Sequence, residues 1–103
     1  MIYIFKDNEK GDSLNQVEFQ LKINGVNIDL TGTGIKANFM LGTQTKAMSI
    51  SNGLSFTDIV NGKFKINTQI INWDIGLWQM EVQFIFPDGR IKTYLKGQLN
   101  IVD

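Results

Sequence analysis

Apolar and polar residues alternate along most of this 103-residue chain, which predicts a protein built almost entirely from β-strands. In residues 16–23, QVEFQLKI, the side chains of Val17, Phe19, Leu21 and Ile23 fall on one face and polar side chains on the other. This arrangement is typical of an antiparallel strand with one buried face. Nowhere does an amphipathic helical pattern persist over three turns.

The same alternation predicts further strands along the chain. Glycines at roughly ten-residue intervals separate them, as in sandwiches and barrels. A layer with one apolar face must pack against another layer, so we predict two antiparallel sheets of about seven to nine short strands, packed as an immunoglobulin-like sandwich. A small closed barrel is the alternative, and the length suits a single domain over residues 1–103. The further strands are expected at residues 2–5, 26–30, 35–41, 47–51, 54–58, 63–66 and 77–86.

The last segment, residues 90–103, is predicted to be one bent strand. Its inward positions are all odd-numbered on both sides of Gly97, whereas a hairpin at Lys96-Gly97 would move the later ones to the opposite face. The inward residues are expected to be Ile91, Thr93, Leu95, Leu99 and Ile101.

Pro87-Asp88-Gly89 predicts a turn, because proline fixes φ and glycine accepts a positive φ. A three-residue loop would place Phe84 opposite Lys92 and bury lysines, so we expect a four-residue loop that ends at Arg90. The pairs that follow are Phe84 with Thr93, Val82 with Leu95, Trp78 with Leu99 and, on the outer face, Glu81 with Lys96.

Residues 24–34, NGVNIDLTGTG, form a glycine-rich segment that suggests either a phosphate-binding loop or a corner between strands. A phosphate loop needs a helix to follow it, with its N-terminus facing the anion. Here an alternating strand follows instead, which favours the corner.

Charge and composition narrow the chemistry. Ten basic and ten acidic residues cancel, so we expect neither nucleic acid nor an anionic membrane surface as a partner. The chain has no cysteine and no histidine, which removes disulfides, thiolate or imidazole metal sites and histidine-activated nucleophiles. The apolar opening is too short for a signal peptide or a membrane span, so synthesis in the cytoplasm is expected.

No catalytic, cofactor-binding or metal-binding residue is predicted. Oxygen ligands that calcium could use gather in residues 6–12, KDNEKGD, namely Asp7, Asn8, Glu9 and Asp12. Their spacing does not match a calcium loop, and lysines offset their charge, so a solvated loop is the expected structure.

Two aromatic residues are candidates for an exposed interface. Trp73 lies at a predicted turn, and Tyr94 lies on the polar face of the last strand. An exposed tryptophan or tyrosine can stack on a sugar ring or anchor a protein interface. For Trp73 the alternative is a lid over one end of the sandwich, whereas Trp78 falls on the inward face and is expected in the core.

Two blocks of this sequence resemble a known family. Residues 10–32, KGDSLNQVEFQLKINGVNIDLTG, and residues 76–103, GLWQMEVQFIFPDGRIKTYLKGQLNIVD, are similar to the immunoglobulin-like N-terminal domain of upper baseplate proteins in tailed phages of Gram-positive bacteria. The middle, residues 35–75, matches only in general pattern. The resemblance implies a non-enzymatic domain that holds a tail-tip protein in the baseplate, commonly as part of a trimer.

The leading hypothesis is therefore a non-catalytic structural module of a phage or prophage tail, located in the virion and bound to other tail proteins. The chain ends at Asp103 without the coiled coil or receptor-binding head that the resemblance would lead one to expect, so no host-binding residue is carried over. The alternative is a small carbohydrate-binding module that uses Trp73 or Tyr94.

Overall fold

The computed structural model describes residues 2–103 and confirms an all-β chain. Thirteen strands and one short 3-10 helix, η1 (Ile59–Asn61), follow one another in these residues. No helix in this range is long and apolar enough to cross a membrane. The strands are β1 (Ile2–Ile4), β2 (Asn8–Glu9), β3 (Ser13–Leu14), β4 (Val17–Gln20), β5 (Lys22–Ile23), β6 (Val26–Asn27), β7 (Gly34–Leu41), β8 (Gln44–Ile50), β9 (Gly53–Asp58), β10 (Lys63–Ile66), β11 (Gln69–Ile70), β12 (Gly76–Ile85) and β13 (Ile91–Val102).

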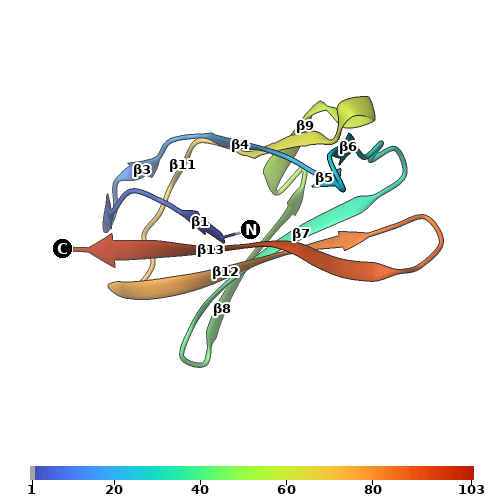
Figure 1. Ribbon diagram of the computed structural model, residues 1–103. Coiled ribbons are helices and arrows are strands. Elements are labelled where there is room, and N and C mark those ends of the chain that lie inside the picture. Colours follow the sequence, from blue (N-terminus) through green and yellow to red (C-terminus); the bar gives the residue numbers. More distant parts are fainter. Residues whose placement is uncertain (1) are drawn as a thin grey trace.

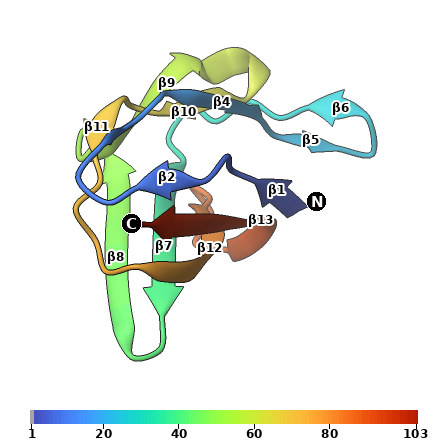
Figure 2. The same cartoon turned by 90° about the vertical axis from the view of Figure 1, so that its left-hand side faces the viewer.

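Most of these strands belong to one large curled sheet. Its order is β1-β13-β12-β7-β8-β9-β10-β4, and β2 also pairs with β13. Figure 1 shows β13 beside β12, and Figure 2 also labels β2 and β10. The strands β3 and β11 form a small separate sheet, and β5 and β6 form another. The large sheet curls so that β4, β9 and β10 lie across from β7, β12 and β13, with the core between them (Figure 2).

This layered arrangement corrects the prediction of two separate, purely antiparallel sheets. The large sheet is continuous from one layer to the other and is mixed, because β1 and β2 run parallel to β13 and β8 runs parallel to β9. The chain changes layer at Ser51, whose φ of 71° turns it directly from β8 into β9.

The strand count exceeds the prediction because one expected strand is divided and because β2, β3 and β11 lie in segments where no strand was expected. The segment predicted as one strand at residues 16–23 is interrupted at Leu21. Leu21 donates its backbone N–H to the carbonyl of Gly62 (2.8 Å), while its own carbonyl accepts a hydrogen bond from the N–H of Ile28 (3.2 Å). The chain thus exchanges β10 for β6 as its partner, yet the inward face persists, since Phe19 and Leu21 are both buried.

The glycine-rich segment is a corner, as predicted. Asn24 and Gly25 have φ values of 51° and 77° and join β5 to β6 in a two-residue turn. Gly32, with φ of 75°, turns the chain again before β7 begins.

The hairpin between β12 and β13 differs from the prediction at its tip. Phe86 donates its N–H to the carbonyl of Arg90 (2.9 Å), which closes a three-residue loop, Pro87-Asp88-Gly89. The predicted four-residue loop was therefore wrong, and Phe84 pairs with Lys92 rather than with Thr93. Lys92 is nevertheless exposed, so the shorter loop buries no lysine.

A β-bulge at Tyr94 reconciles this loop with the rest of the hairpin. Gln83 pairs with Thr93 and Val82 with Leu95, which leaves Tyr94 as the extra residue on β13. Beyond the bulge, the predicted pairs Val82–Leu95, Trp78–Leu99 and Glu81–Lys96 are all confirmed.

The bulge also explains which inward residues of β13 were predicted correctly. An extra residue shifts the alternation by one, so the odd positions between the bulge and the loop lie on the outer face. Ile91 and Thr93, expected inward, are accordingly exposed, and the paired Ile85 is 41% exposed. Leu95, Leu99 and Ile101 are buried as predicted, and the strand is continuous through Gly97.

The buried apolar side chains form one cluster between the two layers. Trp78 has no exposed surface and donates its Nε1–H to the carbonyl of Asp74 (2.8 Å). The prediction that Trp78 is a core residue is thus confirmed. The inward faces of β7, β10 and β12 contribute many of the remaining members, which are Ile35, Ala37, Phe39, Phe64, Ile66, Met80, Val82 and Phe84.

Candidate functional site

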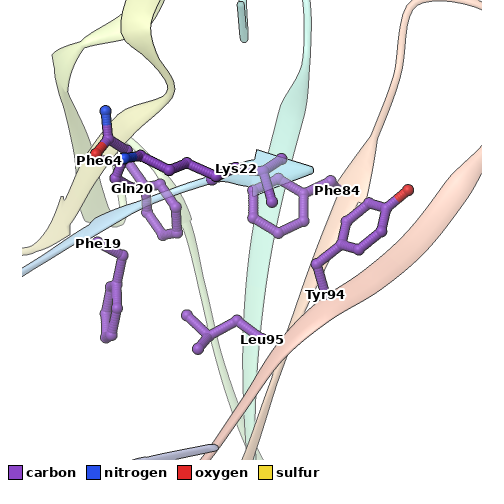
Figure 3. Close-up of a pocket in the computed structure, with 8 residues that line it drawn as sticks. Phe19, Gln20, Lys22, Phe64, Phe84, Tyr94 and Leu95 are labelled. Carbon is purple, nitrogen blue, oxygen red and sulfur yellow. The ribbon is translucent and has the colours of Figure 1, made fainter. Parts of the chain in front are cut away.

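An open groove of about 240 Å³ lies between β4–β5 and the β12–β13 hairpin. Phe19 and Leu21 line one wall, and Tyr94 and Leu95 line the other. Figure 3 shows Phe19 on the left and Tyr94 on the right. The buried ring of Phe84 lies at its base, together with that of Phe64. The groove therefore has an apolar, mainly aromatic lining, to which the polar residues Gln20 and Lys22 add a rim.

The bulge on β13 places Tyr94 at this groove. In a bulge two residues oppose one on the partner strand, and the extra residue is turned toward a new direction. Tyr94 lies 6.1 Å from the ring of Phe84 and 6.4 Å from that of Phe86, and it remains 37% exposed. Its hydroxyl points away from Phe84, which leaves one ring edge and the phenol oxygen available to a partner (Figure 3).

Trp73 occupies a different part of the molecule. It is half-buried, and its ring lies 5.1 Å from Phe39 and 5.2 Å from Trp78. This packing corresponds to the lid that was the alternative to an exposed contact. Trp78 and Phe84 are six positions apart on β12, roughly 20 Å, so the structure does not bring Trp73 and Tyr94 into one site.

The groove carries unpaired positive charge. Lys22 lines it, and Lys92 shares the inner face of the hairpin with its partner Phe84. The ion pairs found in residues 2–103 join Lys10 to Asp74 and Arg90 to Asp88, so neither of these two lysines has an acidic partner.

Two carboxylates in the described chain have a lowered pKa, and both lie in turns outside the lining of the groove. The Oδ1 atom of Asp29 accepts hydrogen bonds from the hydroxyl (2.6 Å) and the N–H (2.9 Å) of Thr31, and these bonds lower its pKa. A backbone hydrogen bond from Arg90 is the main cause of the lowered pKa of Asp88. These carboxylates order turns and are not paired as an acid and a base.

The lowered pKa of Asp29 predicts an acid-sensitive turn. Its contribution to stability is fully present above the ordinary value of 3.8 and is lost as the pH falls through the lower folded-state value. Asp29→Asn should therefore make the melting temperature fall less steeply below that pH than it does in the wild type. Melting curves recorded from neutral pH to about pH 2 test this, and identical slopes for the two proteins would refute it.

The acidic side chains of residues 6–12 are not gathered into one cluster. Within residues 2–103 there is no cluster of three or more carboxylates that could hold an ion. Asn8 is buried and donates its Nδ2–H to the carbonyls of Glu9 (3.2 Å) and Asp12 (3.3 Å). It thereby stabilises its own turn, which explains an asparagine at this position without a ligand.

The sequence pattern singled out Tyr94 but missed the groove beside it. Lys22 and Gln20 alternate with apolar residues as ordinary outward side chains, and Phe19 and Phe64 are ordinary inward ones. Only the pairing of β4 with β10 and the position of the bulge bring them together with Tyr94. The sequence contains one weak sign of the bulge. A three-residue loop at Pro87-Asp88-Gly89 does not fit the apolar alternation of residues 95–101 unless the last strand contains an extra residue.

Comparisons with known proteins indicate both family and fold. The sequence model described as the BppU N-terminal domain matches residues 5–73. This match contains the first block that resembles the family, residues 10–32. It also contains most of residues 35–75, which resemble the family only in general pattern. The second block, residues 76–103, lies outside the match. No curated protein matches the sequence of this chain.

A similar fold occurs in the crystal structure of a putative glycoside hydrolase from Bacteroides vulgatus. The TM-score is 0.51 and the sequence identity 15%, over 95% of this chain. The aligned region spans 17% of that structure's chain. At this identity the likeness concerns the fold alone.

Proposed function

Because the chain belongs to the BppU N-terminal domain family, we propose that it is a non-catalytic structural domain of a phage or prophage tail baseplate, which binds other tail proteins. The match over residues 5–73 is the observation that carries this proposal. The family implies a location in the virion tail, after synthesis in the host cytoplasm. The partners are other baseplate proteins, and assembly as a trimer is part of the proposal.

The physical character of the surface supports a binding role. The groove at Tyr94 combines aromatic side chains with a polar rim, a composition typical of the anchor regions of protein interfaces. A net charge of zero gives little self-repulsion and so tolerates a crowded assembly.

Co-expression with the products of the neighbouring tail genes tests this proposal. The chain should co-purify with at least one of them, and size-exclusion chromatography with light scattering should give a defined complex. A strict monomer that binds none of these proteins would contradict it.

Tyr94→Ala should weaken that complex by at least about tenfold, because a half-exposed tyrosine above an apolar groove is a typical interface anchor. Its melting temperature should change little, since the ring is partly in solvent. Ile70→Ala is the matched control, because Ile70 is 70% exposed on β11 and does not line the groove. Titration of each variant against the tail partner gives the comparison, and equal affinities for Tyr94→Ala and wild type would place the interface elsewhere.

A second candidate function is a small carbohydrate-binding module. The exposed ring of Tyr94, next to the polar side chains of Gln20 and Lys22, favours it, since sugars stack on aromatic rings and bind to amide and ammonium groups. A glycan array with wild type and Tyr94→Ala separates the two functions. Specific binding that the variant loses would favour the carbohydrate module.

A further inference from the structure

The wall of the groove formed by β13 is a free sheet edge. Within residues 2–103, the stretch from Ile91 to Leu95 pairs with β12 alone, because β1 covers Lys96–Gln98 and β2 covers Ile101 and Val102. The opposite wall, β4, ends the order of the large sheet and pairs with β10 alone. In the described part of the chain, two unpaired edges therefore border the same groove.

The direction of the free backbone groups follows from the hairpin. Phe86 donates to the carbonyl of Arg90, so this carbonyl points toward β12, while the N–H of Arg90 donates to Asp88 within the turn. Because the direction alternates along an antiparallel strand, the N–H and C=O groups of Ile91 and Thr93 point away from β12. No backbone hydrogen bond to either residue from outside the hairpin is found in residues 2–103.

The molecule already adds a strand to this edge a few residues further on. β1 runs parallel to β13, with Ile2 opposite Lys96 and Ile4 opposite Gln98. The free stretch at Ile91 and Thr93 lies on the same side of β13, in line with β1 and next to the groove. An extended peptide in this place would hydrogen-bond to β13 and direct alternate side chains into the groove.

Charge decides what kind of peptide fits. Lys22 lines the groove and Lys92 lies between the two free positions, and neither forms an ion pair within residues 2–103. A second copy pairing along this edge would bring Lys92 close to its equivalent, an unfavourable like-charge contact. A different chain with carboxylates would instead neutralise both lysines.

We propose that the groove binds an extended, acidic segment of a partner protein, which adds to the free edge of β13 as a further strand. The inference rests on the proposed function and specifies its interface. Apolar side chains of the segment contact Tyr94, Leu95 and Phe19, and its carboxylates lie near Lys22 and Lys92.

A pair of octapeptides provides the probe. Both alternate valine or phenylalanine with polar residues; one carries glutamates and the other carries lysines at the same positions. Saturation with the glutamate peptide should slow amide hydrogen exchange at Ile91 and Thr93 by about tenfold or more, because both N–H groups become bonded. The lysine peptide should bind at least about tenfold more weakly.

Thr93→Pro and Thr93→Ala are matched variants for the strand itself. Proline removes the outward N–H but no bond to β12, whereas alanine keeps that N–H. Thr93→Pro should weaken binding of the glutamate peptide by at least about fivefold, and Thr93→Ala should remain within about twofold of wild type. Lys22→Glu is a second test, which does not require the fold to tolerate a proline. This variant should bind the lysine peptide more tightly than the glutamate peptide.

Unchanged exchange at Ile91 and Thr93 with the glutamate peptide at millimolar concentration would overturn the inference. So would a glycan that shifts the Tyr94 signals when neither peptide does. Co-purification separates the inference from the proposed function: if Thr93→Pro and Lys22→Glu join the tail complex as tightly as wild type, the added strand is refuted and the baseplate role stands. If wild type joins no tail protein, the baseplate role fails, while the peptide result still decides the strand.

Discussion

Trp78→Ala is expected to lower the free energy of unfolding by about 3–5 kcal/mol, the usual cost of removing a large aromatic side chain from a packed core. The indole has no exposed surface, and its loss would also remove the support for the half-buried ring of Trp73, 5.2 Å away. The carbonyl of Asp74 would lose the hydrogen bond from Nε1 (2.8 Å). Urea denaturation should show a lower midpoint with an unchanged slope.

Two control variants separate the loss of the buried ring from the loss of its hydrogen bond and from the effect of a surface substitution. Trp78→Phe keeps an aromatic ring but removes the Nε1–H, so its cost should be clearly smaller than that of Trp78→Ala, about 1–3 kcal/mol. Gln79→Ala, at the exposed neighbouring position, should change stability by less than about 0.5 kcal/mol. A cost below about 1 kcal/mol for Trp78→Ala would show that this indole does not hold the two layers together.

Gly62→Ala is expected to cost about 3 kcal/mol or more, since it combines backbone strain with a collision between backbones. Gly62 has φ of 76°, and an added Cβ would lie 2.7 Å from the carbonyl oxygen of Ile28 and 2.8 Å from that of Leu21. Neither carbonyl can move freely, because the bond from the N–H of Leu21 to Gly62 and the bond from Ile28 to Leu21 both hold the corner. A melting curve and a urea titration measure the loss.

Gly25→Ala is the matched control for the strain alone. Gly25 has almost the same φ, 77°, but an added Cβ would meet nothing within 4 Å. Its cost should therefore be about 1–2 kcal/mol, from the left-handed backbone only. If Gly62→Ala and Gly25→Ala lost the same free energy of unfolding, the close contact at Gly62 would contribute nothing to the loss.

Much of the fold follows from local alternation. The inward faces of residues 35–39, 64–66 and 78–84 are confirmed because each strand buries one face against a single core, and a period of two then fixes which side chains enter it. The same reasoning correctly gives the unbroken strand through Gly97. These features need only the pattern within one strand.

The remaining features depend on relations between strands. The bulge at Tyr94 inverts the parity of Ile91 and Thr93, and a pattern that assumes constant alternation places both on the wrong face. The interruption at Leu21 likewise arises from two different partners, Gly62 and Ile28. Neither partner is identified by the residues next to Leu21.

The candidate site shows the same division. Tyr94 was identified from its own chemistry and place on a strand, but the groove needs the strand order that sets β4 across from the hairpin. The free edge at Ile91 and Thr93 needs, in addition, the register that sets Ile2 of β1 opposite Lys96 of β13. Such information lies in contacts between residues far apart in the chain, which a single sequence does not display.

The parallel pairing of β1 and β2 with β13 has a mechanical consequence. Tension that pulls Ile2 and Val102 apart would draw parallel neighbours past each other in opposite directions. The hydrogen bonds at Lys96–Gln98 and at Ile101–Val102 would then be loaded together, in shear, instead of opening one after another as in unzipping. A domain stretched between these two points would resist a pulling force along β13 better than its few terminal hydrogen bonds suggest.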